Sequence, residues 1–131
     1  MSTLATPNDH AERRAHQRAT DEFPHVVDRL RDLVGATLVA YIGGVRETRA
    51  VTQWAEQRRT PPEKTQQRLR RALHAAEILS DRDDAGVVRA WFQGMNPELG
   101  DIAPARLLRD GPSDEAGPAV LAAARSFRAA G

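Results

Sequence analysis

Apolar side chains recur at helical spacing along most of the chain after about residue 23. One stripe at 26–34 ends at Gly35, and others follow at 38–42, 50–55, 69–79, 87–92, 107–108 and 120–127. Three or four apolar positions in every two turns are typical of helices that bury one face. The only β-like run, at 39–42, is too short to compete with the helical reading. We therefore predict an all-α fold, helical throughout residues 24–129, with breaks at Gly43-Gly44, Gly94 and Gly111-Pro112.

Proline, glycine and capping residues predict where some of these helices start. Thr60 is expected to cap a long helix that runs to about Ser80, with Pro61 in its first turn and Glu63 completing a capping box. Residues 111–118 are rich in glycine and proline. We expect them to form a loop before the last helix.

Composition divides the chain into three regions. Residues 1–22 are polar and charged and show no apolar stripe, so we expect an arm that is disordered or partly helical. Two helical regions follow, at residues 23–80 and residues 81–131. The whole length of 131 residues suits one domain or slightly more.

The stretch from Leu38 to Gln57 is typical of two short helices joined by a tight turn at Gly43-Gly44. Glycine tolerates the left-handed backbone that such a turn needs. The second helix carries an apolar stripe that includes Val51 and Trp54, one residue later than in the usual spacing of a helix-turn-helix. We interpret residues 23–80 as a DNA-binding helix-turn-helix region. The alternative is an ordinary helical hairpin in a core.

The polar side chains of this second helix are expected to face away from its apolar stripe. In a helix-turn-helix they would meet DNA, with some at base edges and others at phosphates. The expected base-edge residues are Thr48, Arg49, Thr52 and Gln53, and the expected phosphate-binding residues are Arg46, Arg58 and Arg59.

Positive charge gathers in the same part of the chain. The net charge of the whole chain is +1, but residues 46–74 alone carry a net +5, whereas residues 1–45 carry −1 and residues 75–131 carry −3. A local excess of this kind is expected of a phosphate-binding face. The alternative is a solvated, arginine-rich helix face.

Residues 90–108 contain a series of short sequence motifs in a distinctive order. Trp91 lies in a predicted helix and is followed by Asn96-Pro97, Leu99-Gly100, Pro104 and Leu107-Leu108. This pattern resembles the toxin-binding domain of the Xre/MbcA/ParS antitoxin family, and with the preceding helix-turn-helix the resemblance covers about residues 36–128. It implies an all-helical antitoxin whose residues 81–131 form the toxin-binding domain. Its partner would be a RES-domain toxin, which consumes NAD, and the complex would repress its own operon.

The resemblance also implies which residues meet the toxin, because the C-terminal region of the family is thought to cover the toxin's NAD-binding cleft. The expected toxin-binding residues are Asn96, Pro97, Leu99, Pro104, Arg125, Phe127 and Arg128. From the residues themselves, Val87, Val88, Trp91 and Phe92 are expected to point into the core. It stays open whether Phe127 closes this chain's own core, with solvated arginines beside it, or enters a partner.

The sequence shows no pattern that is typical of a catalytic site, a metal site or a membrane-spanning segment. There is no cysteine, the four histidines at 10, 16, 25 and 74 lack ligand spacing, and no apolar run matches a bilayer span. We expect a cytoplasmic protein that is not an enzyme and needs no cofactor. Its expected partners are a RES-domain toxin and operator DNA, and half-site reading predicts a homodimer or a toxin–antitoxin hetero-oligomer. The alternative function is a stand-alone helix-turn-helix regulator without a toxin.

Overall fold

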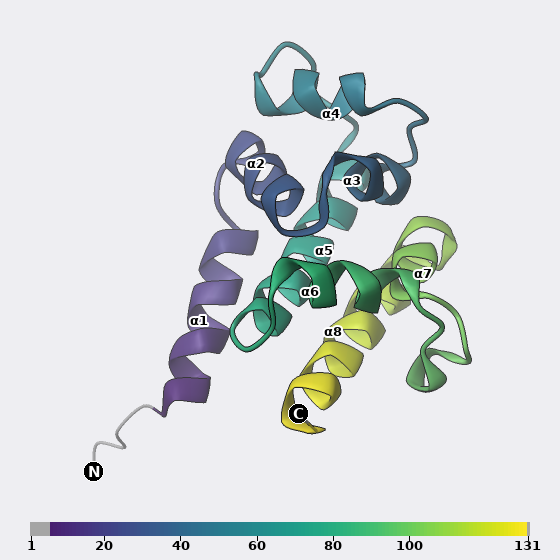
Figure 1. Cartoon of the computed structure of the whole chain (residues 1–131). Helices are drawn as coiled ribbons and strands as arrows, with labels where there is room; N and C mark the ends of the chain where they lie inside the picture. Colours follow the sequence, from purple (N-terminus) through teal and green to yellow (C-terminus); the bar gives the residue numbers. More distant parts are fainter. Residues whose placement is uncertain (1–5, 131) are drawn as a thin grey trace.

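The computed structural model describes residues 6–130, and this part of the chain is helical without a β-strand, which confirms the all-α prediction (Figure 1). The helices are α1 (Pro7–Ala19), α2 (Phe23–Val34), α3 (Ala36–Gly43), α4 (Thr48–Ala55), α5 (Glu63–Ser80), α6 (Ala85–Gln93), the 3-10 helix η1 (Pro97–Leu99), α7 (Pro104–Asp110) and α8 (Ser113–Ala130). No helix among residues 6–130 is long and apolar enough to cross a membrane.

Helix α5 forms the centre of the molecule. Helices α1, α2, α3 and α8 all pack against it, and its C-terminal half is surrounded on every side. Between Ala72 and Leu79, only His74 is not buried. A helix that is buried all round lies in a core rather than on its edge. The two predicted regions therefore share one hydrophobic core built on α5.

Helix α1 corrects the expectation of an arm without an apolar stripe. Thr6 caps the helix through a capping box with Asp9. Ala11, Ala15 and Ala19 are buried at a spacing of four residues, which places them on one face. Alanine is small, so α1 lies close to α5 despite its charged composition. Residues 1–5 of the predicted arm lie outside the described residues.

Two predicted boundaries are wrong for steric and packing reasons. Helix α5 begins at Glu63 with Pro62 at the N-cap and no side-chain cap, so the predicted capping box of Thr60 does not form. A residue that precedes proline avoids the helical region, which keeps Pro61 extended before Pro62. Residues 113–118 are not a loop but the start of α8, with Pro118 exposed inside the helix.

The end of α3 is shaped by Trp54 of α4. Gly44 adopts a left-handed φ of 79° and caps α3, as predicted for this turn. Gly43 has a different role, because a Cβ at this position would lie 3.0 Å from Cη2 of Trp54. The indole is 2 % exposed and lies beside Phe23, with ring centroids 6.5 Å apart. It joins α2, α3 and α4.

Replacing Trp54 should therefore destabilise the fold. We expect Trp54→Ala to lower the free energy of unfolding by roughly 3–5 kcal/mol, because a buried aromatic ring leaves a large cavity. Urea denaturation measures this change, with Trp54→Phe as a milder variant that also removes the unpartnered indole N–H. A loss below about 1 kcal/mol would contradict the burial of this side chain.

His74 is half-buried where α1, α5 and α8 meet. The centroid of its ring lies 5.8 Å from that of His16 on α1. Burial lowers the pKa of His74 below its ordinary value of 6.5, the positive charge of Arg125 lowers it further, Glu12 raises it, and His16 lowers it slightly. The net effect disfavours the protonated ring in the folded state.

The stability of the protein should consequently fall in mild acid. As the pH drops below 6.5 the unfolded chain protonates at His74 before the folded chain does, so the free energy of unfolding decreases until the lower folded pKa is passed. We expect His74→Gln to flatten this slope when thermal unfolding is followed between about pH 8 and pH 5, the range around the ordinary histidine pKa. His10→Gln, on the exposed face of α1, should leave the slope in place. An unchanged slope in His74→Gln would contradict the assignment.

Candidate DNA-binding and partner-binding surfaces

Helix α4 presents a polar face to solvent. Ala50, Val51 and Trp54 are buried against the core, which leaves the rest of the helix outside. The predicted DNA-binding residues lie on this outer face and on the segments beside it: Arg46, Thr48, Arg49, Arg58 and Arg59 are exposed, and Thr52 and Gln53 are partly exposed. Figure 1 shows α4 at one end of the molecule, so that its outer face is accessible.

A shallow groove of about 420 Å³ runs along α4. Four of the seven predicted residues line it, namely Arg46, Arg49, Gln53 and Arg59, together with Val45, Glu47 and Ala50. The remaining three, Thr48, Thr52 and Arg58, do not line it. The structure thus gathers three arginines and a glutamine at one place, with Glu47 as the acidic group among them.

The loop after α4 determines which of the two neighbouring arginines reaches this groove. Gln57 has a positive φ of 62°, which reverses the chain. The backbone N–H groups of Arg58 and Arg59 both donate to the carbonyl of Gln53, at 2.9 Å and 3.3 Å. Arg59 returns to the groove, whereas the side chain of Arg58 pairs with Glu56 at 2.7 Å.

A second groove, of about 590 Å³, lies between α6, the turn at η1 and the C-terminal half of α8. It holds three of the four large apolar side chains that are exposed among residues 6–130: Met95 at 80 %, Phe127 at 41 % and Val87 at 39 %. Trp91 also lines it, with its ring centroid 6.4 Å from that of Phe127. The groove is lined mainly by apolar side chains, and we call it the apolar groove.

The prediction that Val87 points into the core is wrong. Val88 and Phe92 are fully buried, whereas Val87 and Trp91, one turn apart, face the apolar groove. Both edges of α6 are apolar, and only tertiary packing decides which of them the core covers. The exposed edge becomes part of a surface.

The predicted toxin-binding residues separate into three sets. Asn96, Pro97 and Phe127 line the apolar groove. Leu99 and Pro104 are buried. Arg125 and Arg128 lie on α8 outside the groove.

The turn at η1 is held in place by contacts within residues 96–102. The side chain of Asn96 caps η1 by accepting a hydrogen bond from the N–H of Glu98 at 3.0 Å. A bridge between Asn96 and Ile102 closes the turn, and Gly100 adopts a left-handed φ of 65° within it. Asn96 thus caps this turn and Gly100 ends it. They fix Met95 at the edge of the groove.

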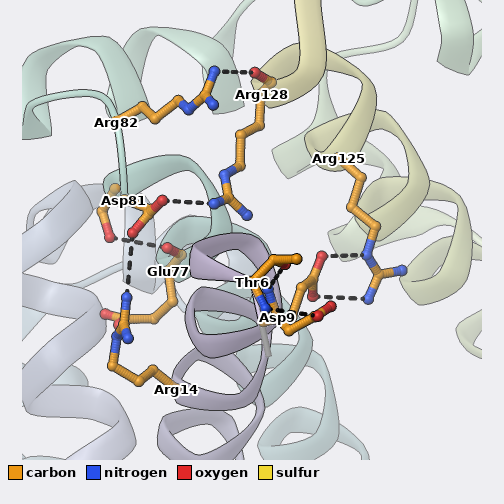
Figure 2. A network of polar contacts seen from close by, with 10 residues as sticks. Thr6, Asp9, Arg14, Glu77, Asp81, Arg82, Arg125 and Arg128 are labelled. Atoms are coloured by element: carbon orange, nitrogen blue, oxygen red, sulfur yellow. Dashed lines mark hydrogen bonds and ion pairs between the residues drawn. The ribbon is translucent and has the colours of Figure 1, made fainter. Parts of the chain in front are cut away.

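The two arginines of α8 serve the protein's own structure (Figure 2). Arg128 is 7 % exposed, and its Nη2 donates to Asp81 at 2.6 Å. Arg125 donates to both carboxylate oxygens of Glu12, at 2.9 Å and 3.3 Å. These contacts tie α8 to α1 and to the end of α5. Arg128 is therefore not the exposed cation that the sequence suggested.

Sequence reasoning missed Met95 and Val87 as groove residues. A signal for Met95 was present, because a long apolar side chain directly before a capped turn has no helix stripe in which to be buried. Val87 carried no such signal. Comparisons of the chain with models of protein families, with curated proteins and with solved structures find no match. Within residues 6–130 no group of three or more histidine or acidic side chains is placed to hold a metal ion.

Proposed function

We propose that this chain is the antitoxin of a type II toxin–antitoxin pair, which binds a RES-domain toxin through its apolar groove and operator DNA through the outer face of α4. The observation that carries the proposal is the apolar groove itself. It lies at the Asn96-Pro97 turn, where the sequence resembles a toxin-binding domain.

The composition of the groove supports a protein partner. Apolar patches of this kind usually mark interfaces, and methionine and aromatic side chains are enriched there. Met95 has 80 % of its surface exposed, so the fold of this chain covers little of it. Trp91 forms part of the lining, and Glu98 and Ser126 supply polar groups. The capped turn holds this surface in one shape, so little ordering is needed when a partner binds.

The mode of neutralisation follows from which side chains are available. Arg128 is buried and paired, so the proposed contact with the toxin is apolar and centres on Met95, Phe127 and Val87. Pro97 and Asn96 shape the adjoining turn. A RES-domain toxin that docks here would have its NAD-binding cleft covered by the α6–η1 corner and the end of α8.

The second surface supports the repressor half of the proposal. Arg46, Arg49 and Arg59 converge on the groove of α4, and an arginine fork suits both guanine edges and phosphates. Helix α4 and the C-terminal end of α8 lie at opposite ends of the molecule in Figure 1, so toxin and DNA could be bound together. Reading of two half-sites requires a dimer, which stays a prediction.

Single charges placed in the apolar groove test the toxin-binding half. We expect Met95→Asp and Phe127→Asp to abolish rescue of growth when the protein is co-expressed with a RES-domain toxin encoded next to it, since an apolar interface does not accept an unpaired carboxylate. The matched control is Thr37→Asp, which places the same charge at an exposed position on α3 outside the groove and should still rescue. Circular dichroism checks that each variant is folded. Full rescue by both groove variants would rule the groove out as the toxin-binding surface.

Removal of α8 is not a substitute for this experiment. Val120, Ala123 and Ala124 of α8 are buried in the common core, so a chain that ends before α8 would lose its fold together with its partner. Point substitutions at exposed positions avoid this problem.

Binding to the DNA upstream of the gene tests the second half. We expect Arg49→Ala to lose about 1–3 kcal/mol of sequence discrimination and Arg59→Ala to reduce the salt slope of binding by about one unit. Fluorescence anisotropy at several salt concentrations measures both, with the exposed Arg106→Ala on α7 as the control. If neither affinity nor slope changes in the two variants, α4 does not read DNA. DNA binding without any bound toxin would favour the stand-alone regulator.

A further inference from the structure

We propose that a cavity between the N-terminal half of α5 and the start of α8 binds a phosphate group, either as the free ion or as a monoester. The cavity holds about 130 Å³ and is lined by Lys64, Gln67, Arg68 and Arg71 of α5 and by Ser113 and Gly117 of α8, among others. It lies apart from the groove of α4 and from the apolar groove, and the proposal does not depend on the function assigned to them.

Three positive charges converge on this cavity without acidic partners. Lys64, Arg68 and Arg71 follow one another at spacings of four and three residues, which places them on one face of α5. None of them takes part in an ion pair with any residue from 6 to 130, although nine such pairs occur there. Like charges at these spacings repel one another, so an anion between them is stabilised.

Donor groups remain available after the contacts within the protein are counted. Arg68 donates from Nη1 to the carbonyl of Ile42 at 3.3 Å, and Arg71 donates from Nη1 to the carbonyl of Ser113. A guanidinium has five N–H groups, so each arginine keeps further donors. Lys64 is the only lysine in the sequence, and it is exposed at the rim with three donors of its own.

The wall formed by α8 is built around Arg71. A Cβ at Gly117 would lie 2.8 Å from Nε of Arg71, which is closer than such atoms approach one another. Glycine is a poor helix former, and here it allows the guanidinium to lie against the helix backbone. The first turn of α8 adds the positive end of its dipole on the same side. Asp114 and Glu115 are exposed in that turn and pair with none of the three cations in the described part of the chain.

The charge and size of the site favour a dianion. Three cations around a small, partly enclosed cavity balance two negative charges better than one. A phosphodiester of a nucleic-acid backbone carries one charge and two ester substituents, which suit an open face more than this cavity. We therefore assign the cavity to inorganic phosphate or a phosphate monoester.

The test is a titration of the full-length, ¹⁵N-labelled protein with inorganic phosphate at constant ionic strength and a pH at which the dianion dominates. We expect saturable shifts of the amide signals of Lys64, Ser113 and Gly117, and weaker shifts near Ile42 through Arg68. Lys64→Gln and Arg71→Gln should each weaken binding about tenfold, as expected for the loss of a charged hydrogen bond. Arg106→Gln, an exposed arginine on α7, should bind as the unchanged protein does.

Lys64→Gln alters an exposed side chain for which no hydrogen bond within residues 6–130 is found, so it keeps the test sharp even if Arg71→Gln disturbs the fold. Shifts that do not saturate, that chloride reproduces, or that persist unchanged in Lys64→Gln would overturn the proposal. Methyl phosphate and dimethyl phosphate serve as further arms. Tighter binding of methyl phosphate would identify a monoester as the ligand and tighter binding of inorganic phosphate the free ion, whereas equal or tighter binding of dimethyl phosphate would overturn the preference for a dianion.

Discussion

One buried carboxylate, that of Glu77, joins three helices through its ion pairs. Glu77 lies in the half of α5 that is surrounded on all sides, and its side chain is 4 % exposed. A charge in such a place must be paired. Arg18 of α1 pairs with it at 2.6 Å and Arg29 of α2 at 2.5 Å, so one side chain fixes three helices. Helix α1 depends on this contact most, because it otherwise buries only alanine side chains.

The same arrangement decides which charges are left for function. At the end of α5, Asp81 pairs with Arg14 and Arg128, and on α1 Glu12 pairs with Arg125 (Figure 2). The arginines Arg125 and Arg128 of α8 therefore stabilise the packing of the helices. The groove beside the end of α8 is consequently apolar rather than basic. At the other end of the molecule, basic side chains lack acidic partners. Five arginines and one lysine line the groove of α4 and the cavity between α5 and α8, and they form no ion pair with any residue from 6 to 130: they are Arg46, Arg49, Arg59, Arg68, Arg71 and Lys64.

The spacing of apolar and capping residues along the sequence predicted most of the helices. It failed where a helix or an ion pair depends on residues that are far apart in the sequence. The stripes of α2 and α4 are set within a few residues, and both were predicted. The stripe of α1 was missed because alanine is weakly apolar. The start of α8 was missed because glycine usually interrupts a helix, whereas Gly117 makes room for the side chain of Arg71. In the candidate sites, Asn96, Pro97 and Phe127, which were expected from the sequence, line the apolar groove, whereas the pairing of Arg128 depends on Asp81, 47 residues away. The exposure of Val87 and Met95 follows from packing alone, and the roles in DNA and toxin binding stay predictions.

Whether the apolar groove binds a partner is tested most directly at Met95, its most exposed side chain. The sequence contains two methionines, Met1 and Met95, so methyl-¹³C labelling gives two signals, and Met95→Leu assigns them. On addition of an equimolar RES-domain toxin, the Met95 signal should shift and become protected from a soluble paramagnetic agent. If the complex forms while the Met95 signal keeps its free position and its accessibility, the toxin binds elsewhere and the apolar groove is not the toxin-binding surface.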